Sequence, residues 1–120
     1  MAQALLALAL FLNVGVLVPV LLGLMRDAPW AEAAYGPDSP ARQILVTLYA
    51  TILGASLVAL ALAASGQQGL ATCLAIPLLA LQVSYKLLTL PAVGAANPVV
   101  RANLGIAAFH ALTLAVLFLQ

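Results

Sequence analysis

Charged residues are scarce in this chain of 120 residues: Asp, Glu, Lys and Arg together make up 6% of it, whereas hydrophobic residues make up 66%. A soluble domain of this size needs far more polar surface to stay in solution. The mean hydropathy of +1.20 therefore predicts a membrane protein. The net charge of +1 excludes the basic surface that nucleic-acid binding requires.

Cysteines and embedded carboxylates are also few. The single cysteine, Cys73, lies in an apolar run, so we expect neither an intramolecular disulfide nor a cysteine-based metal site. All three acidic residues, Asp27, Glu32 and Asp38, fall in one connection between apolar segments. Paired-carboxylate catalysis then has no site inside the membrane, and a Ser–His–Asp triad would need a carboxylate that reaches His110 from that connection. We expect a protein that is not an enzyme and holds no metal.

Four apolar segments are long enough to cross a bilayer, which takes about 20 residues. The first has no basic n-region and exceeds the roughly 7–15 residues of a signal-peptide core, so we interpret it as a retained span. After it, the stretch PWAEAAY predicts a short interfacial helix, because proline suits a first helical position and Trp and Tyr favour the headgroup level. The sequence predicts an all-α integral membrane bundle of four antiparallel transmembrane helices in a single domain, residues 1–120, with spans at about 3–25, 43–64, 69–91 and 98–119.

The connections carry helix-start signals. Ser39-Pro40 and Asn97-Pro98 each place a capping side chain directly before a proline at the first helical position. The stretch SGQQG is so short that the second and third spans must form an antiparallel hairpin. A loop is expected at PAVGAAN, residues 91–97.

Small and polar side chains predict where helices pack. Asn13 lies near mid-membrane, where an unpaired amide costs free energy, so we expect it to face another helix. Small residues recur every fourth position along the second span and again along the fourth, which lets another backbone approach closely. That backbone can belong to this chain or to another chain. The predicted packing residues are Asn13, Thr47, Thr51, Gly54, Ala55, Ala59, Ala107 and Ala111.

A polar layer is predicted in one half of the bundle. Counted from the span ends at about 1.5 Å per residue, Gln82 and His110 lie roughly 12–14 Å deep, and Lys86 lies about 8 Å deep. The third and fourth spans each carry their polar residues on one face, at helical spacings. Ionisable residues within spans often mark pathways or ligand sites. The candidate ligand-binding residues are Tyr49, Gln82, Tyr85, Lys86, Asn103 and His110.

Both ionisable residues also have a plain structural interpretation. The long stem of Lys86 would reach the interface near Pro91. His110 would be a neutral imidazole hydrogen-bonded to Gln82, to Tyr49 or to a backbone carbonyl. A pigment, haem or quinone at His110 is a further alternative, although one histidine per chain supplies a pair of haem ligands only across an oligomer.

The basic residues indicate the orientation. Arg26, Arg42, Lys86 and Arg101 all fall on the side of the first and third connections. Basic residues stay on the cytoplasmic side of a membrane. We therefore expect a multi-pass protein of the bacterial inner (cytoplasmic) membrane with both termini on the non-cytoplasmic side.

In length and span count the chain resembles the small multidrug-resistance transporters. The resemblance implies a membrane-embedded glutamate in the first span, where this chain has only Asn13. We expect instead a non-enzymatic accessory or structural subunit that packs against helices of a larger membrane complex, as a hetero-complex or homo-oligomer in the lipid bilayer. The alternative is a small oligomeric transporter or channel that uses a layer of Gln82, Lys86 and His110.

Overall fold

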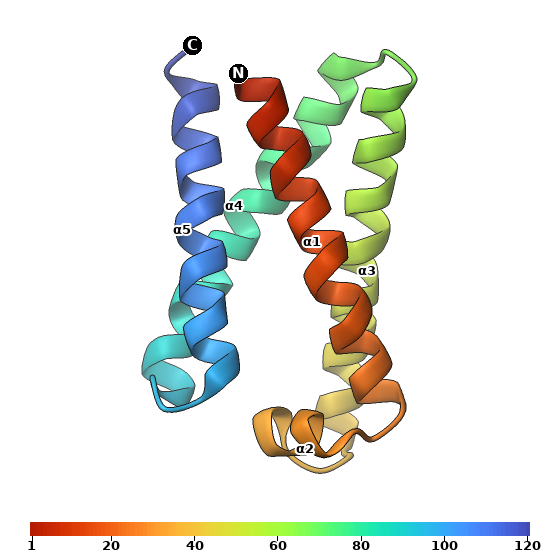
Figure 1. Ribbon diagram of the computed structural model, residues 1–120, viewed down its shortest axis with the longest axis vertical. Helices are drawn as coiled ribbons and strands as arrows, with labels where there is room; N and C mark the ends of the chain where they lie inside the picture. Colours follow the sequence, from red (N-terminus) through yellow and green to blue (C-terminus); the bar gives the residue numbers. More distant parts are fainter.

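The computed structural model describes all 120 residues and contains helices but no strands (Figure 1). Every helix except the second is long and apolar enough to cross a membrane, which confirms the predicted all-α bundle. The longest dimension, 43 Å, matches the roughly 40–45 Å of a bilayer with its headgroups. The helices are α1 (Ala2–Met25), α2 (Pro29–Tyr35), α3 (Pro40–Ala64), α4 (Gln68–Val93) and α5 (Pro98–Phe118).

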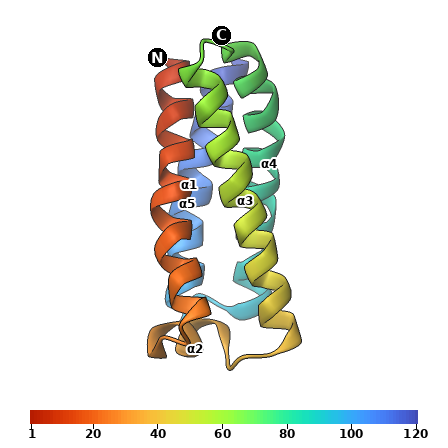
Figure 2. The same cartoon turned by 90° about the vertical axis from the view of Figure 1, so that its right-hand side faces the viewer.

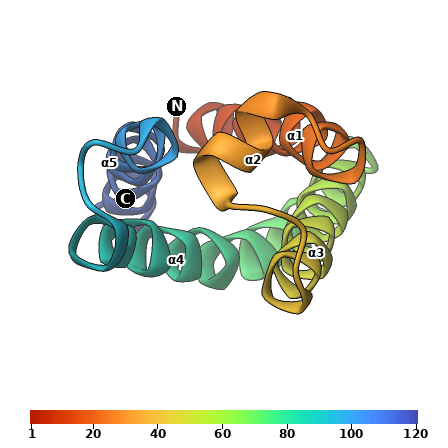
Figure 3. The same ribbon diagram turned by 90° about the horizontal axis from the view of Figure 1, so that it is seen from below.

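The four long helices form a ring in the order α1, α3, α4, α5, seen along the bundle in Figure 3. Neighbouring helices in this ring run antiparallel. Both termini and the α3–α4 turn lie at one end, called the terminal end here. The short helix α2 and the α4–α5 loop lie at the other, called the α2 end (Figures 1 and 2).

The helix starts follow their capping residues. The Ser39 hydroxyl accepts a hydrogen bond from the Arg42 backbone N–H at 3.1 Å, and Pro40 opens α3. The Asn97 side-chain oxygen accepts from the Val99 N–H at 2.8 Å, and α5 begins at the proline between them. These bonds satisfy backbone donors that the first turn of a helix leaves free.

The end of α4 differs from the expectation. The sequence predicts a loop from Pro91, but α4 continues to Val93 and ends before Gly94. A proline removes only one backbone donor, which the last turn of a helix tolerates. Gly94 supplies the terminus, because it adopts a φ of +100° that favours glycine, and its N–H donates to the Leu90 carbonyl at 2.9 Å.

The two ends of the bundle are packed differently. At the terminal end, alanines on three helices let the backbones approach closely, and the buried cluster there is Leu6, Ala9, Leu10, Ala59, Ala75 and Leu79. Toward the α2 end, the fully buried members of a second cluster come from α1, α2 and α3: Leu17, Leu21, Leu24, Ala31, Tyr49 and Ile52. From α4 only the partly buried Leu78 and Tyr85 pack against this cluster, α5 contributes nothing to it, and space remains between the helices in that half.

Side-chain contacts hold α2 across its end of the bundle. Arg42 is only 3% exposed. Its guanidinium donates to the Leu24 carbonyl at 2.7 Å, to the Gly36 carbonyl at 3.1 Å and to the Asp27 carboxylate at 2.7 Å. These bonds tie the end of α1 and the end of α2 to the first turn of α3.

Two further contacts fix the position of α2. The Trp30 ring lies so close to Gly23 that a Cβ there would come within 2.1 Å of it. On the opposite side, the Asn97 side-chain amide donates to the Ala34 carbonyl at 2.9 Å. The short helix is therefore attached to α1, to α3 and to the start of α5.

The predicted packing residues divide between the inside and the outside of the bundle. Asn13, Ala59 and Ala107 are buried, whereas Ala55 is half-buried. The remaining four are exposed in the single chain: Thr47, Thr51, Gly54 and Ala111. The face that α3 turns inward carries Tyr49, Ile52, Ser56 and Ala59 instead.

The exposed threonines of α3 have their polar needs met within the helix. The Thr47 hydroxyl donates to the Ile44 carbonyl at 2.7 Å, and the Thr51 hydroxyl donates to the Thr47 carbonyl at 2.9 Å. Such back-bonding leaves a surface of methyl groups, which suits lipid as well as another helix. Packing of this face against a second chain stays a prediction.

Candidate functional site

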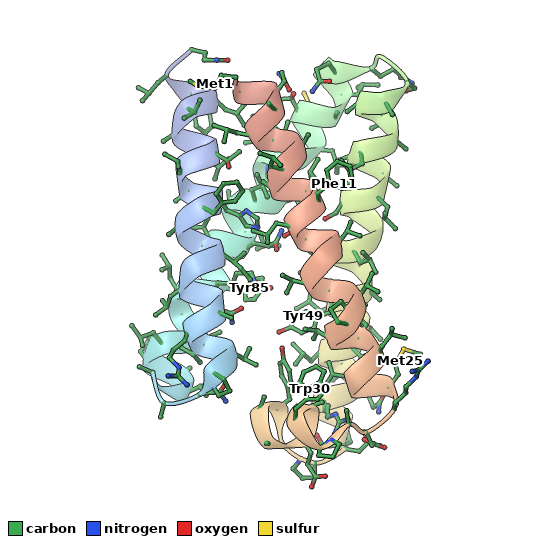
Figure 4. The ribbon with its side chains drawn as sticks, viewed as in Figure 1. Met1, Phe11, Met25, Trp30, Tyr49 and Tyr85 are labelled. Atoms are coloured by element: carbon green, nitrogen blue, oxygen red, sulfur yellow. The ribbon has the colours of Figure 1, made fainter.

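Two adjoining cavities lie in the α2 half of the bundle. The larger, of about 190 Å³, is lined by residues of α2, α3, α4 and α5. The smaller, of about 70 Å³, lies between α1 and α5 and reaches Lys86. Both are lined by Tyr35, Tyr49, Val99 and Asn103, so we treat them as one space, the tyrosine–lysine cavity. Figure 4 shows Tyr49 and Tyr85 in the space between the helices on this side of the bundle.

Lys86 lies inside the bundle and not at the interface. Only 5% of its surface is exposed. Its ammonium donates to the Asn103 side-chain oxygen at 3.0 Å and lies 5.1 Å from the centre of the Tyr85 ring. The Thr89 hydroxyl donates to the Lys86 backbone carbonyl at 2.6 Å and completes this group between α4 and α5.

No carboxylate of the chain balances the charge of Lys86. The structure contains one ion pair, between Arg42 and Asp27 at 2.7 Å. Asp38 accepts from the Gln43 amide at 2.6 Å on the exposed surface, and Glu32 is exposed on α2. A buried cation without a counter-ion is unfavourable in a low-dielectric interior. Lys86 is the one charged residue that lines the cavity, and the chain supplies no counter-ion for it.

Three tyrosines line the cavity around this cation. Tyr35 and Tyr49 pack edge to face, with ring centres 6.1 Å apart. Burial, and to a smaller extent the neighbouring Tyr49, raises the pKa of Tyr35 above its ordinary value of 10.0. The Tyr35 phenol therefore keeps its proton at neutral pH and is available to donate a hydrogen bond. The Tyr85 hydroxyl is buried and has no hydrogen-bond partner in the chain.

A second polar group lies closer to the middle of the bundle. The His110 ring is completely buried, and its Nε2 lies 2.9 Å from the Asn13 side-chain oxygen. The Asn13 amide donates to the Ser56 hydroxyl at 3.1 Å, which donates to the Ile52 carbonyl at 2.8 Å. Because the Asn13 oxygen is an acceptor in this arrangement, Nε2 carries the imidazole hydrogen and Nδ1 is left as an acceptor.

Gln82 is 1% exposed, and its side-chain nitrogen has no hydrogen-bond partner. The His110 Nδ1 is likewise buried and unpartnered. One residue thus has a free donor and the other a free acceptor, on the neighbouring helices α4 and α5. The partners expected for His110 from the sequence, Gln82, Tyr49 or a backbone carbonyl, differ from the partner observed, which is Asn13.

The predicted polar layer is therefore two groups and not one. Around the cavity the structure brings together Tyr49, Tyr85, Lys86 and Asn103. His110 and Gln82 line neither this space nor the hollow beside Trp30 on the outer surface. No hydrogen bond joins the two groups.

Sequence reasoning missed several residues of the site. Tyr35 was assigned to the headgroup level by its type, whereas it points into the cavity. The Ser56 hydroxyl accepts a hydrogen bond from the Asn13 amide. No feature of the sequence indicates this role for Ser56 except that it lies at the same depth as Asn13. Thr89, which lies three residues after Lys86 on the same face of α4, lines the larger cavity.

Neither a metal-binding group nor a match to a known protein indicates what the site binds. No group of three or more His, Cys, Asp or Glu side chains that could hold a metal lies together. No protein family, curated protein or solved structure matches the chain.

Proposed function

We propose that this chain is a non-enzymatic membrane protein that binds a small molecule in the tyrosine–lysine cavity, as a small transporter does. The observation that supports this most directly is Lys86, a buried ammonium beside an open space, with no carboxylate of the chain to pair with. Embedded ionisable residues of this kind are costly, and they usually serve a substrate or an ion.

The shape of the space favours a binding site over a continuous pore. The cavity is confined to the α2 half of the bundle. Beyond it lie the buried His110 and then the apolar cluster at the terminal end, of which Leu6, Leu10 and Leu79 are at most 1% exposed. A molecule that reaches Lys86 therefore meets closed packing on the far side, as in a carrier that is open to one side only.

Binding can be tested without knowing the natural ligand. The purified protein in a non-ionic detergent is heated with a panel of anionic, cationic, zwitterionic and neutral amphiphiles, and the unfolding temperature is measured. A ligand present at 100 times its Kd stabilises the folded state by about 2.7 kcal/mol. We expect at least one member of the panel to raise the unfolding temperature.

A matched pair of substitutions locates the binding. Val99→Phe adds bulk to the cavity wall, whereas Val58→Phe makes the same change at an exposed position of α3. Stabilisation should be lost in the Val99 variant and kept in the Val58 variant. If no amphiphile stabilises the protein and none co-purifies with it, the proposal is overturned.

The expected location is also part of the proposal: the inner membrane of a bacterial cell, with the α2 end in the cytoplasm. The support is that Arg26, Arg42 and Arg101 belong to the helix ends that meet at the α2 end (Figure 1). Basic residues favour that side of a membrane.

A second candidate is the accessory subunit expected from the sequence. It is favoured by Thr47, Thr51 and Gly54, which form an exposed small-residue surface on α3. Gly54→Leu should then reduce the amount of a partner protein that co-purifies from native membrane. Gly105→Leu is the control, because Gly105 is also exposed in a helix and has no neighbouring atom within 4 Å of an added Cβ. Purification of the chain alone would count against this candidate.

A further inference from the structure

Resting on the proposed function, we infer that the ligand of the tyrosine–lysine cavity is an anionic amphiphile. Its carboxylate or phosphate group lies against Lys86, and its apolar chain passes between α1 and α5 into the bilayer. The inference names the class of ligand and its route, and it follows from charge, donor chemistry and the walls of the cavity.

The charge of Lys86 selects an anion. Each acidic side chain of the protein lies in the connection between α1 and α3, so none reaches the α4–α5 contact where the ammonium lies. The Asn103 oxygen provides one neutral acceptor at 3.0 Å for a group with three donors. An anionic ligand would accept the remaining donors and would cancel the buried charge.

The other polar groups of the cavity are suited to the same ligand. The Tyr85 hydroxyl has no acceptor in the chain. Tyr35 and Tyr49 bring two more phenols to the same space. A carboxylate only accepts hydrogen bonds and has room for about four. A cationic ligand would face Lys86 without any acidic group to receive it.

The volume of the cavity fits the head group of an amphiphile and leaves its apolar tail outside the cavity. The larger space holds about 190 Å³, which is roughly six times the 30 Å³ that a water molecule occupies in the liquid. This accommodates a carboxylate or phosphate and a few adjoining atoms, but not a whole lipid. The apolar remainder of the ligand must therefore lie elsewhere.

The smaller space, the one that Lys86 lines, supplies the route for that remainder, and the head group lies where the two spaces adjoin, beside their shared residue Asn103. It lies between Val16 and Val20 of α1 and Ala102 and Ile106 of α5. Figures 1 and 4 show α1 and α5 close together near the termini and separate toward the α2 end. The only side-chain hydrogen bond between these two helices, from His110 to Asn13, lies on the terminal side of this opening. Apart from Asn103, the side chains that α1 and α5 give to this space are aliphatic, so they suit an alkyl chain.

The head-group test compares probes with one chain and different ends: dodecanoate, dodecanol and dodecylamine, with acetate and inorganic phosphate as anions without a chain. We expect dodecanoate to bind the purified protein about tenfold tighter than dodecanol, the ratio that a charge-assisted hydrogen bond supplies. Lys86→Met, which keeps an unbranched side chain, should remove that ratio. Tighter binding of acetate or phosphate than of dodecanoate would assign the site to free anions and overturn the role of the chain.

The results separate this inference from the function on which it rests. Dodecanol or dodecylamine binding as tightly as dodecanoate would overturn the anionic ligand and leave small-molecule binding intact. Binding of no probe at all would overturn both. Preference for dodecanoate that persists in Lys86→Met would show that Lys86 is not the group that recognises the anion.

The route has its own matched variants. Ala102→Trp places a ring beside the opening between α1 and α5, and Ala108→Trp places the same ring on another exposed part of α5. The association rate of dodecanoate should fall about tenfold or more in the first variant and stay unchanged in the second. Equal rates in the two variants would overturn entry from the side.

Discussion

At the scale of single residues, the Asn13 side chain joins three helices, its own α1 and both α3 and α5. Its oxygen accepts from His110 on α5, and its amide donates to Ser56 on α3. An asparagine that uses both ends in this way leaves no polar atom to lipid, which is the condition for a stable amide at this depth.

The coupling between Asn13 and His110 can be measured. Asn13→Ala, His110→Ala and the double variant form a cycle in which the two side chains should couple by about 0.5–1.5 kcal/mol in the free energy of unfolding, the range of interhelical hydrogen bonds in membranes. Ser84→Ala is the control, because the Ser84 hydroxyl is exposed and bonds only to the Ala80 carbonyl of its own helix. Strict additivity of the two single changes would contradict the observed contact.

At the scale of an element, α2 owes its position to a few contacts. The helix has only 7 residues, too short to be stable alone in water. Packing against α1 and hydrogen bonds from Arg42 and Asn97 therefore keep it across the bundle end. Since α2 carries Tyr35 into the cavity, those contacts also shape the candidate site.

The contact between α2 and α1 depends on the lack of a side chain at Gly23. Gly23→Ala should displace Trp30, lower the free energy of unfolding by about 1–3 kcal/mol as overpacking does, and shift the fluorescence of Trp30, the only tryptophan in the chain. Gly15→Ala should raise the stability by up to about 1 kcal/mol, since a Cβ there meets no atom within 4 Å. An unshifted emission spectrum in the Gly23 variant would speak against the packing of Trp30 on α1.

The hydrogen bonds of Arg42 give a second prediction for α2. Arg42→Lys keeps the charge but loses the planar fork that reaches three acceptors at once. We expect a loss of about 1.5–3 kcal/mol and faster amide hydrogen exchange in residues 26–39. Arg101→Lys, at an exposed position, should leave exchange in that segment as it is. The same slow exchange in both variants would refute the role of Arg42.

At the scale of the whole molecule, the ends of the bundle differ in charge as well as in packing. The terminal end has no Lys or Arg side chain, whereas Arg26, Arg42 and Arg101 lie toward the α2 end. Such asymmetry determines which way a multi-pass protein inserts.

Insertion can be checked with single cysteines. In a Cys73→Ala background, Gln67→Cys places a thiol in the α3–α4 turn and Ala95→Cys places one in the α4–α5 loop. A membrane-impermeant maleimide should label the first in intact cells, and the second only after the cells are permeabilised. The reverse pattern would invert the proposed orientation and leave the fold unaffected.

The sequence was enough to predict the fold because lipid limits the choices. A spanning segment must satisfy its own backbone, so apolar runs of this length in a chain of this kind form helices. The starts at Pro40 and Pro98 follow from local capping chemistry. The order of the helices around the ring was not predictable, because it depends on which faces fit together.

The candidate site was less accessible to sequence reasoning. Lys86 lies seven residues before Val93, the end of α4, and not five before the expected end at Pro91; the difference adds about 3 Å of depth. The stem then turns toward Asn103 instead of the interface. For α3, the regular spacing of Thr47 and Thr51 predicted a packing face but not whether its partner lies in this chain; the inward face carries the bulkier Tyr49 and Ile52. Large side chains fill the interior with more van der Waals contacts than threonines would, and such contacts favour helix packing in lipid.

The uneven packing described above has a mechanical consequence. If the pair α1–α3 tilted against the pair α4–α5, the closely packed terminal end and the bond from His110 to Asn13 would hold that end in place. The walls of the cavity, at the other end, would then move the most. A small tilt would therefore change the width of the space beside Lys86.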